Sequence, residues 1–360
     1  MTTPTELDSL RTEIEQTNFA LLELLSRRAD LVTRIQQVKT REGVPTFVPE
    51  RERKMLADLV RRNRGPFSDE AVAHLFQEIF RASVALMEAE HEQQMKVSRA
   101  NRPGDLRIAV GSTVIGAEPF LIAGPCAVES EEQMEEVAEL LVSLGVKLIR
   151  GGAYKPRSSP YSFQGLGQRG LEIVRQVARR HGLGSVTEVT DTRTVELVAA
   201  HADVLQVGAR NMHNYELLRE VGRCRKPVLL KRGLAATLDE LLWSAEYVMA
   251  EGNEQIILCE RGIRTFGHDT RNTLDISAVP LLRQRTFLPV VVDVSHAAGR
   301  RDILAPLGRA ALAAGANGLM VEVHPCPAVA RSDSQQQLDF DAFRRFVRDL
   351  GLSRPARCVA

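Results

Sequence analysis

Residues 121–144 read LIAGPCAVESEEQMEEVAELLVSL, and this stretch contains both parts of a repeating unit. The apolar run that leads to Cys126 is typical of a buried β-strand, and the segment from Glu131 to Leu144 is typical of a helix. Short β-rich segments alternate with helical stretches of this kind as far as about residue 350. Such alternation predicts a parallel sheet covered by helices.

Eight of these units follow one another in about 240 residues, the number and size of a (β/α)8 barrel. The expected strands end near Cys126, Tyr154, Glu188, Ala209, Arg232, Gly262, His296 and His324. A doubly wound open sheet is the alternative, but it would not bring the first strand beside the seventh and eighth. We therefore predict a closed barrel with a site at the carboxyl ends of its strands.

In the N-terminal quarter of the chain, the spacing of apolar side chains is different. From Leu7 onward, apolar side chains recur in alternating steps of three and four, which predicts one long amphipathic helix. Thr5 and Asp8 resemble a capping box at its start, and Gly43 with Pro45 should end it.

Two further helices are expected, one with Pro49 at its first position and one starting near Ser68. Three helices of unequal length leave apolar surface on the longest, so we expect a dimer through the long helices. The predicted organisation is an all-helical domain at residues 1–90, a polar linker at 91–103 and the barrel at 104–360.

The totals describe an ordinary globular chain. Hydrophobic residues make up 44% and charged residues 26%, which excludes disordered and fibrous classes. A net charge of +1 gives no reason to expect nucleic acid or a membrane surface as a partner. We expect a cytoplasmic location, because there is no signal-peptide pattern, no apolar run near the about 20 residues of a membrane span, and no paired framework among the five cysteines.

Four side chains near strand ends form a candidate divalent-metal site. They are Cys126, His296, Glu322 and, in the following loop, Asp333. A thiolate, an imidazole and two carboxylates can hold Zn, Fe, Mn or Co and leave a position for a substrate oxygen. Each residue alone is more often structural, but their recurrence at one end of the barrel favours the ligand interpretation.

The same strand ends carry cations, namely Arg150, Lys155, Arg210, Lys231 and Arg261. Like charges that converge at one mouth destabilise the empty protein, so they indicate an anionic substrate. In the loop 155–160, Arg157 and Ser158 are suited to a second phosphate group. We therefore expect two phosphorylated substrates.

Five motifs in this half resemble those of 3-deoxy-D-arabino-heptulosonate 7-phosphate (DAHP) synthases, and the resemblance spans residues 105–350. The motifs are Gly124-Pro125-Cys126-Ala127-Val128-Glu129-Ser130, Lys155-Pro156-Arg157-Ser158-Ser159, Val207-Gly208-Ala209-Arg210-Asn211, Arg271-Asn272-Thr273-Leu274-Asp275 and Asp293-Val294-Ser295-His296. The resemblance implies condensation of phosphoenolpyruvate with erythrose 4-phosphate, the first step of the shikimate pathway.

Roles follow from the resemblance, position by position. Cys126, His296, Glu322 and Asp333 match the metal ligands; Arg150, Lys155, Arg210, Lys231 and Arg261 match phosphoenolpyruvate contacts; Arg157 and Ser158 match the erythrose 4-phosphate loop. Lys155 is also the expected general acid. His324 could support a ligand or be an ordinary hydrogen-bonded histidine. Ser158 replaces a usual Thr, and Ser334-Gln335 replaces a usual Gly-Pro.

The helical half is similar to the all-helical chorismate mutases over residues 5–88. Arg28 lies in the apolar stripe of the long helix, where an unpartnered charge is costly. By the resemblance, the ligand-binding residues are Arg11 from the partner subunit, Arg28, Lys39, Arg51, Glu52 and Ser83.

Two positions depart from the mutase pattern. Met87 stands where a Gln usually hydrogen-bonds the ether oxygen, and Val48 stands where Asp usually precedes Pro49. Loss of such a donor commonly lowers a rate by about 100-fold or more. We therefore expect a domain that binds chorismate or prephenate for feedback inhibition and catalyses weakly.

For the whole chain, two alternative functions remain open. One is a related synthase that uses arabinose 5-phosphate, and the other is a binding protein with an inert barrel.

Overall fold

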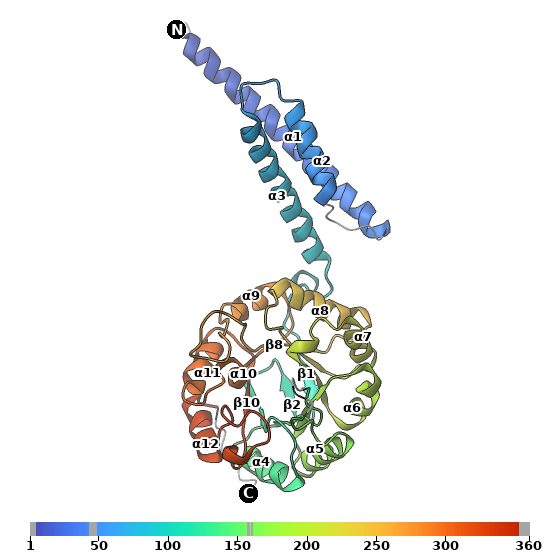
Figure 1. The fold of residues 1–360 in the computed structure, drawn as a ribbon, viewed down its shortest axis with the longest axis vertical. Coiled ribbons are helices and arrows are strands. Elements are labelled where there is room, and N and C mark those ends of the chain that lie inside the picture. The colour runs from blue at the N-terminus through green and yellow to red at the C-terminus, as the bar shows by residue number, and fades with distance from the viewer. Residues whose placement is uncertain (1–4, 43–48, 157–158, 160, 353–360) are drawn as a thin grey trace. The chain divides into compact units, whose positions relative to one another are not determined.

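The computed structural model describes residues 5–42, 49–156, 159 and 161–352, and it divides into two compact units, residues 1–95 and 96–360. The first is helical and the second is a barrel (Figure 1). No helix in the described part of the chain is long and apolar enough to cross a membrane.

The helical unit consists of α1 (Glu6–Glu42), α2 (Pro49–Arg61) and α3 (Asp69–Gln94), with α3 packed against both others. The predicted capping box is present, because the Thr5 backbone N–H donates to Asp8 and the Asp8 N–H donates to Thr5 Oγ1. The helix end expected at Gly43 and Pro45 lies outside the described residues, as does Val48.

The barrel unit is a closed sheet of parallel strands in the order β10-β3-β4-β5-β6-β7-β8-β9. The strands are β3 (Phe120–Gly124), β4 (Leu148–Arg150), β5 (Gly184–Val189), β6 (Val204–Val207), β7 (Val228–Lys231), β8 (Ile256–Glu260), β9 (Val290–Asp293) and β10 (Gly318–Glu322). They are almost entirely buried, as expected for strands covered on both faces.

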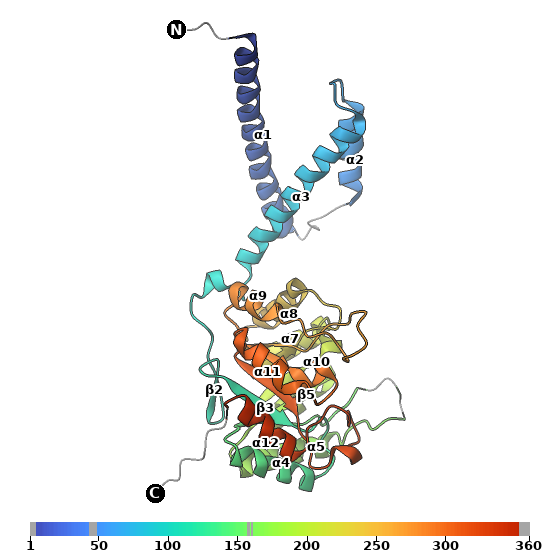
Figure 2. The same ribbon diagram turned by 90° about the vertical axis from the view of Figure 1, so that its left-hand side faces the viewer.

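A helix follows each strand and covers the outside of the sheet, as predicted (Figures 1 and 2). These helices are α4 (Glu131–Ser143), α5 (Gln168–Arg180), α6 (Val195–His201), α7 (Tyr215–Arg223), α8 (Leu238–Ala250), α9 (Ala278–Arg285), α11 (Leu304–Ala313) and α12 (Phe340–Asp349). A short helix α10 (Val294–Ala298) comes directly after β9.

Most strands stop one to four residues before the predicted ends. Cys126 lies two residues beyond β3, and His296 lies in α10 rather than in a strand. The Asp293 carboxylate accepts from the His296 N–H at 3.0 Å, and this cap turns the chain into a helix where the apolar run alone predicted more strand.

An antiparallel hairpin was not predicted. Its strands β1 (Ile108–Val110) and β2 (Thr113–Ile115) pack at the end of the barrel opposite the carboxyl ends of the strands. A Cβ added to Gly184, the first residue of β5, would lie 2.9 Å from a methyl carbon of Val110. Three-residue strands are too short to give a clear period in the sequence.

The segment expected as a linker is ordered in the structure. Helix α3 continues to Gln94, and Met95 and Val97 are buried. The Glu246 carboxylate accepts from the N–H groups of Lys96 and Val97, which attaches this segment to α8 of the barrel.

Candidate active site and metal centre

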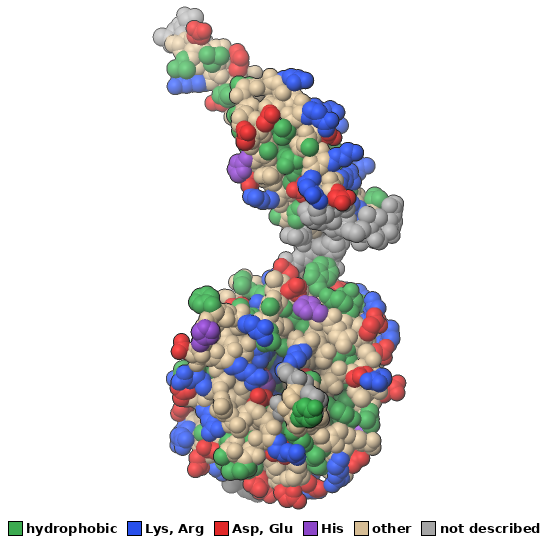
Figure 3. Space-filling view, in the orientation of Figure 1, with side chains coloured by type: hydrophobic (Ala, Val, Ile, Leu, Met, Phe, Trp, Pro, Cys, Tyr) green, Lys and Arg blue, Asp and Glu red, His purple; other side chains and the backbone are tan. Residues whose placement is uncertain are grey.

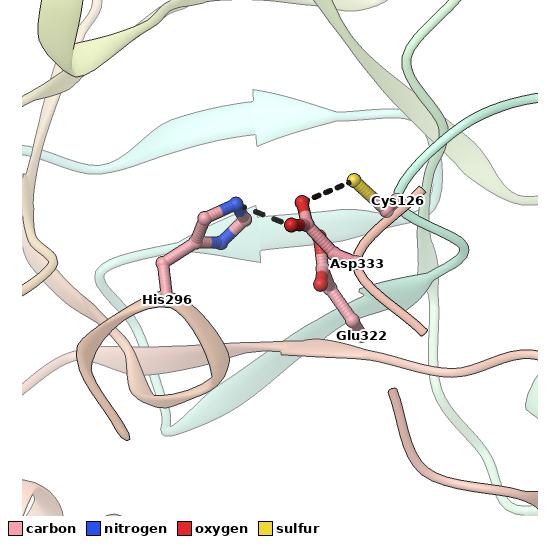
Figure 4. Close-up of side chains that lie close together, drawn as sticks. All are labelled: Cys126, His296, Glu322 and Asp333. Atoms are coloured by element: carbon pink, nitrogen blue, oxygen red, sulfur yellow. Dashed lines mark hydrogen bonds and ion pairs between the residues drawn. The ribbon is translucent and has the colours of Figure 1, made fainter. Parts of the chain in front are cut away.

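Four predicted ligands converge at the carboxyl end of the barrel. One potential ligand atom from each of Cys126, His296, Glu322 and Asp333 lies within 4.8 Å of those of the other three, and the side chains point toward one another (Figure 4). Glu322 ends β10, whereas Asp333 lies in the loop before α12 with a φ of 50°.

Gly124 allows the first ligand to enter the site. Its φ is 146°, and an added Cβ would lie 2.2 Å from the carbonyl oxygen of Arg150. Only glycine can hold this backbone conformation so close to β4. The chain therefore leaves β3 sharply and carries Cys126 over the end of the barrel.

The donor set suits a divalent cation. Glu322 Oε1 and His296 Nδ1 are buried and have no hydrogen-bond geometry to any described group, although Arg150 lies 3.1 Å from Glu322 and Asp293 lies 2.8 Å from His296. His296 Nε2 is the ring nitrogen that faces Glu322, at 3.6 Å. Buried polar atoms without hydrogen bonds are costly, and a cation between the sulfur, nitrogen and oxygen donors would satisfy Glu322 Oε1.

Burial and nearby charges shift the pKa values of the predicted ligands. Burial, together with the charge of Glu322, raises the pKa of the Cys126 thiol to about 12. Burial also lowers the pKa of His296. Burial opposes ionisation of Asp333, but a hydrogen bond from Cys126 and the nearby charges of His296 and Arg271 hold the pKa of Asp333 well below its usual range.

The five predicted cations line one cavity of ≈ 280 Å³, together with His296 and Asp333. Lys and Arg side chains gather in the central hollow of the barrel face in Figure 3. The predicted cations on the cavity lining are Arg150, Lys155, Arg210, Lys231 and Arg261.

The cations are not equivalent. Arg150 pairs with Glu322 at 3.1 Å and Lys231 pairs with Asp293 at 2.5 Å, so two are held by buried carboxylates. The sequence predicted a set of converging like charges, but at these two positions the charge is already paired inside the protein. Arg210 and Arg261, in contrast, donate to backbone carbonyl oxygens and retain net positive charge toward the cavity.

Lys155 lies between the cation set and the ligands. Its Nζ is 3.0 Å from Cys126 Sγ and 2.9 Å from the Cys126 carbonyl oxygen. Burial disfavours its charge, but the acidic groups around it, the Cys126 thiol and Glu188 first, raise the pKa of Lys155 overall. Lys155 therefore carries a proton at neutral pH.

Sequence reasoning missed several residues of the site. Arg264 and Arg271 add two cations to the cavity, and Glu188 and Gln206 add polar groups. Asp293 accepts from Lys231 and caps His296; although burial opposes it, those two charges hold its pKa well below the usual range. Arg271 and Asp293 both occur within quoted motifs, which was the available signal.

His324 does not join the ligand set. Its Nε2 is 3.8 Å from Glu129, and its Nδ1 accepts from the Cys326 N–H at 3.0 Å. These contacts favour the interpretation of His324 as an ordinary packed histidine. Arg157 and Ser158 lie outside the described residues.

The helical unit has its own pocket, lined by the residues that the sequence grouped together. They are Arg28, Lys39, Arg51, Glu52, Ser83 and Met87, with Val32, Ile35, Met55, Phe80 and Val84. Arg28 donates to Ser83 Oγ, lies 5.2 Å from the centre of the Phe80 ring, and has a pKa lowered by burial.

Arg11 is not among the residues that line this pocket. It is exposed and lies 3.5 Å from Asp8 on the same helix. Seventeen residues separate it from Arg28, which is about 25 Å along α1 at 1.5 Å per residue. Arg11 cannot reach the pocket of its own helix.

Comparison with known proteins gives the same division of the chain. The family model of DAHP synthetase I matches residues 93–351, and that of chorismate mutase type II matches residues 10–88. A phospho-2-dehydro-3-deoxyheptonate aldolase of Thermotoga maritima is 54% identical over 255 residues, which cover 71% of this chain and 75% of the relative.

Solved structures agree with the barrel. The crystal structure of a T. maritima DAHP synthase has a TM-score of 0.69 at 53% identity and covers 71% of this chain and 75% of its own. A truncated form of a T. maritima DAHP synthase has a TM-score of 0.67 at 49% identity, covering 71% and 94%. A 2-dehydro-3-deoxyphosphooctonate aldolase of Acidithiobacillus ferrooxidans is 38% identical over 59% of this chain and 82% of the relative.

Proposed function

Because this chain belongs to the DAHP synthetase I family and carries an N-terminal chorismate mutase type II domain, we propose that it condenses phosphoenolpyruvate with erythrose 4-phosphate. In this reaction the enol carbon attacks the aldehyde, water adds to the cationic centre that results, and phosphate leaves. The observation that carries the proposal is the convergence of Cys126, His296, Glu322 and Asp333 beside a cavity whose lining includes the five predicted cations.

The chain's own residues have separate roles in this reaction. Arg150, Arg210, Lys231 and Arg261 bind the carboxylate and phosphate of phosphoenolpyruvate, and Arg157 with Ser158 binds the phosphate of the aldose. Lys155, protonated and half-buried, donates to the developing alkoxide oxygen. A divalent cation held by the four ligands supplies Lewis acidity toward the aldehyde oxygen when bound.

The alternative aldose is arabinose 5-phosphate. The chain is 38% identical to a 2-dehydro-3-deoxyphosphooctonate aldolase, which is the reason to test this alternative. Its higher identity of 54% to a phospho-2-dehydro-3-deoxyheptonate aldolase favours erythrose 4-phosphate. Turnover of phosphoenolpyruvate with each aldose phosphate separates the two. We expect product with erythrose 4-phosphate and little with arabinose 5-phosphate.

For the helical domain we propose binding of chorismate or prephenate as a feedback signal, with weak mutase activity. Arg28, Lys39 and Arg51 around one pocket suit a dicarboxylate ligand. Met87 lines the same pocket and cannot donate a hydrogen bond to the ether oxygen, where charge develops during rearrangement. Inhibition of the synthase by these ligands, with slow mutase turnover, tests this proposal.

We also propose that two copies of α1 pair, and that the full assembly is a tetramer. Ile14 is 60% exposed and Leu24 is 62% exposed in the single chain, an apolar surface that a partner helix would cover. Pairing would also bring the partner's copy of Arg11 to the pocket.

We further propose a cytoplasmic location. A reducing cytoplasm suits an enzyme that depends on the free thiol of Cys126.

A further inference from the structure

Each of the two carboxylate ligands presents one oxygen to the site and has the other oxygen bound elsewhere. Glu322 Oε1 faces His296, and Glu322 Oε2 accepts from Gln336 Nε2 at 2.6 Å. Asp333 Oδ2 faces Cys126 Sγ at 3.0 Å, and Asp333 Oδ1 lies 3.1 Å from a guanidinium nitrogen of Arg271.

Gln336 connects these two outer contacts. Its side chain is buried, with 2% exposed, and its Oε1 accepts from the same nitrogen of Arg271 at 2.9 Å. A continuous path therefore runs from Glu322 through Gln336 and Arg271 to Asp333. An amide is the neutral side chain that can donate at one end of such a path and accept at the other.

We propose that Gln336 is a positioning residue for the metal centre, which fixes Glu322 directly and Asp333 through Arg271 so that each binds with one oxygen. This inference rests on the proposed metal-dependent function. A carboxylate with one oxygen already bound is a poorer bidentate ligand, so coordination positions remain for water and the substrate aldehyde. Gln336 is thus a positioning residue and not a catalytic one.

The local backbone explains why such a path is needed. Asp333 has a positive φ in a loop, so no regular element orients its side chain. Arg301 fixes only the backbone of this loop, by donating to the carbonyl oxygens of Ser334 and Gln335 at 2.6 and 3.1 Å. The carboxylate itself is held by Arg271.

Close backbone packing against the end of α10 fixes the position of Arg271. Gly299, at the end of α10, has a φ of 68°, and a Cβ added there would lie 2.3 Å from the Cβ of Arg271. The Arg271 N–H donates to the Ala298 carbonyl at 2.9 Å. The helix that carries His296 therefore also places the guanidinium that holds Asp333.

The test compares Gln336→Met, which keeps the approximate shape and removes both hydrogen bonds, with Gln335→Met at the exposed neighbouring position. Full-length protein is stripped of metal, and Co²⁺ affinity is measured by chelator competition. The thiolate-to-cobalt absorption and the kcat and KM of the synthase are then recorded. We expect Gln336→Met to weaken Co²⁺ binding by about 10- to 100-fold, to change the absorption spectrum and to lower kcat more than it raises KM. Gln335→Met should behave as the wild type.

A second arm breaks the same path from its more exposed end. Arg271→Met, where the side chain is 40% exposed, should also weaken Co²⁺ binding, and the double variant should lose less than the product of the two single effects. Wild-type affinity and spectrum in Gln336→Met would overturn the role of Gln336, whatever the result for Arg271→Met. A wild-type protein that binds no divalent metal would instead overturn the proposed metal centre.

Discussion

At the scale of single residues, Cys126 is the most sensitive point of the site. Cys126→Ala or His296→Ala should abolish metal-dependent synthase turnover, because each removes one of four ligands. The fold should remain, since neither change opens a cavity like that of a buried Leu→Ala change, which costs about 2–5 kcal/mol. Phosphate release and thermal unfolding measure the two effects. Substantial metal-stimulated activity in either variant would refute the ligand assignment.

The raised pKa of Cys126 predicts how metal affinity depends on pH. Below about 12 the metal-free thiol is protonated, whereas the ligand is the thiolate, so metal binding must release a proton. Affinity should therefore rise with pH, by up to about tenfold per unit. Calorimetry in buffers of different ionisation enthalpy should report about one proton released near pH 8. Affinity that does not change between pH 7 and 9 would contradict this assignment.

Lys155 should affect catalysis more than binding. Loss of a general acid typically lowers a rate by about 10²- to 10⁴-fold, so Lys155→Ala should lose kcat by that order with a smaller change in the KM for phosphoenolpyruvate. Lys96→Ala, at an exposed position in the segment before the barrel, provides a matched loss of charge. An unchanged kcat in Lys155→Ala would remove its role as the acid.

At the scale of elements, the repeat in the sequence was enough to predict the barrel and the order of its eight strand and helix units. The ends of the strands were less accurate, because the apolar run of β9 continues through Val294 into α10, where a side-chain cap decides the structure. The hairpin β1–β2 was missed because its strands are three residues long. Local periodicity cannot report such short or tertiary features.

The same limit applies to the site. Residues that end strands could be predicted, since the topology brings strand ends together. Gln336 could not, because its importance depends on a hydrogen bond across the loop to Glu322 and on Arg271 from another part of the chain. Such contacts exist only in the folded protein.

The exposed stripe of α1 predicts the effect of a charge there. Ile14→Asp should break the helix pairing and halve the assembly, because burying an unpaired carboxylate in an apolar interface is costly. Glu15→Asp, one position away on the polar side, is the control. Analytical ultracentrifugation distinguishes the species. An unchanged mass for Ile14→Asp would contradict an α1 interface.

At the scale of the whole molecule, the two units predict separable functions. A chain that begins at Met95 retains the buried segment with Met95 and Val97 and should remain an active synthase that ignores prephenate. The full-length enzyme should be inhibited several-fold, since allosteric coupling typically amounts to about 1–3 kcal/mol. A full-length enzyme that is insensitive to both chorismate and prephenate, or that has rapid mutase turnover, would refute the sensor assignment.

The most direct test of the whole account is the loss of phosphoenolpyruvate with erythrose 4-phosphate, measured on purified protein as isolated, after chelation, and after re-addition of Mn²⁺, Fe²⁺, Co²⁺ or Zn²⁺. We predict turnover that disappears on chelation, returns with at least one of these ions, and is much slower with arabinose 5-phosphate. Full activity after complete removal of metal, or no activity with erythrose 4-phosphate under any of these conditions, would contradict the account.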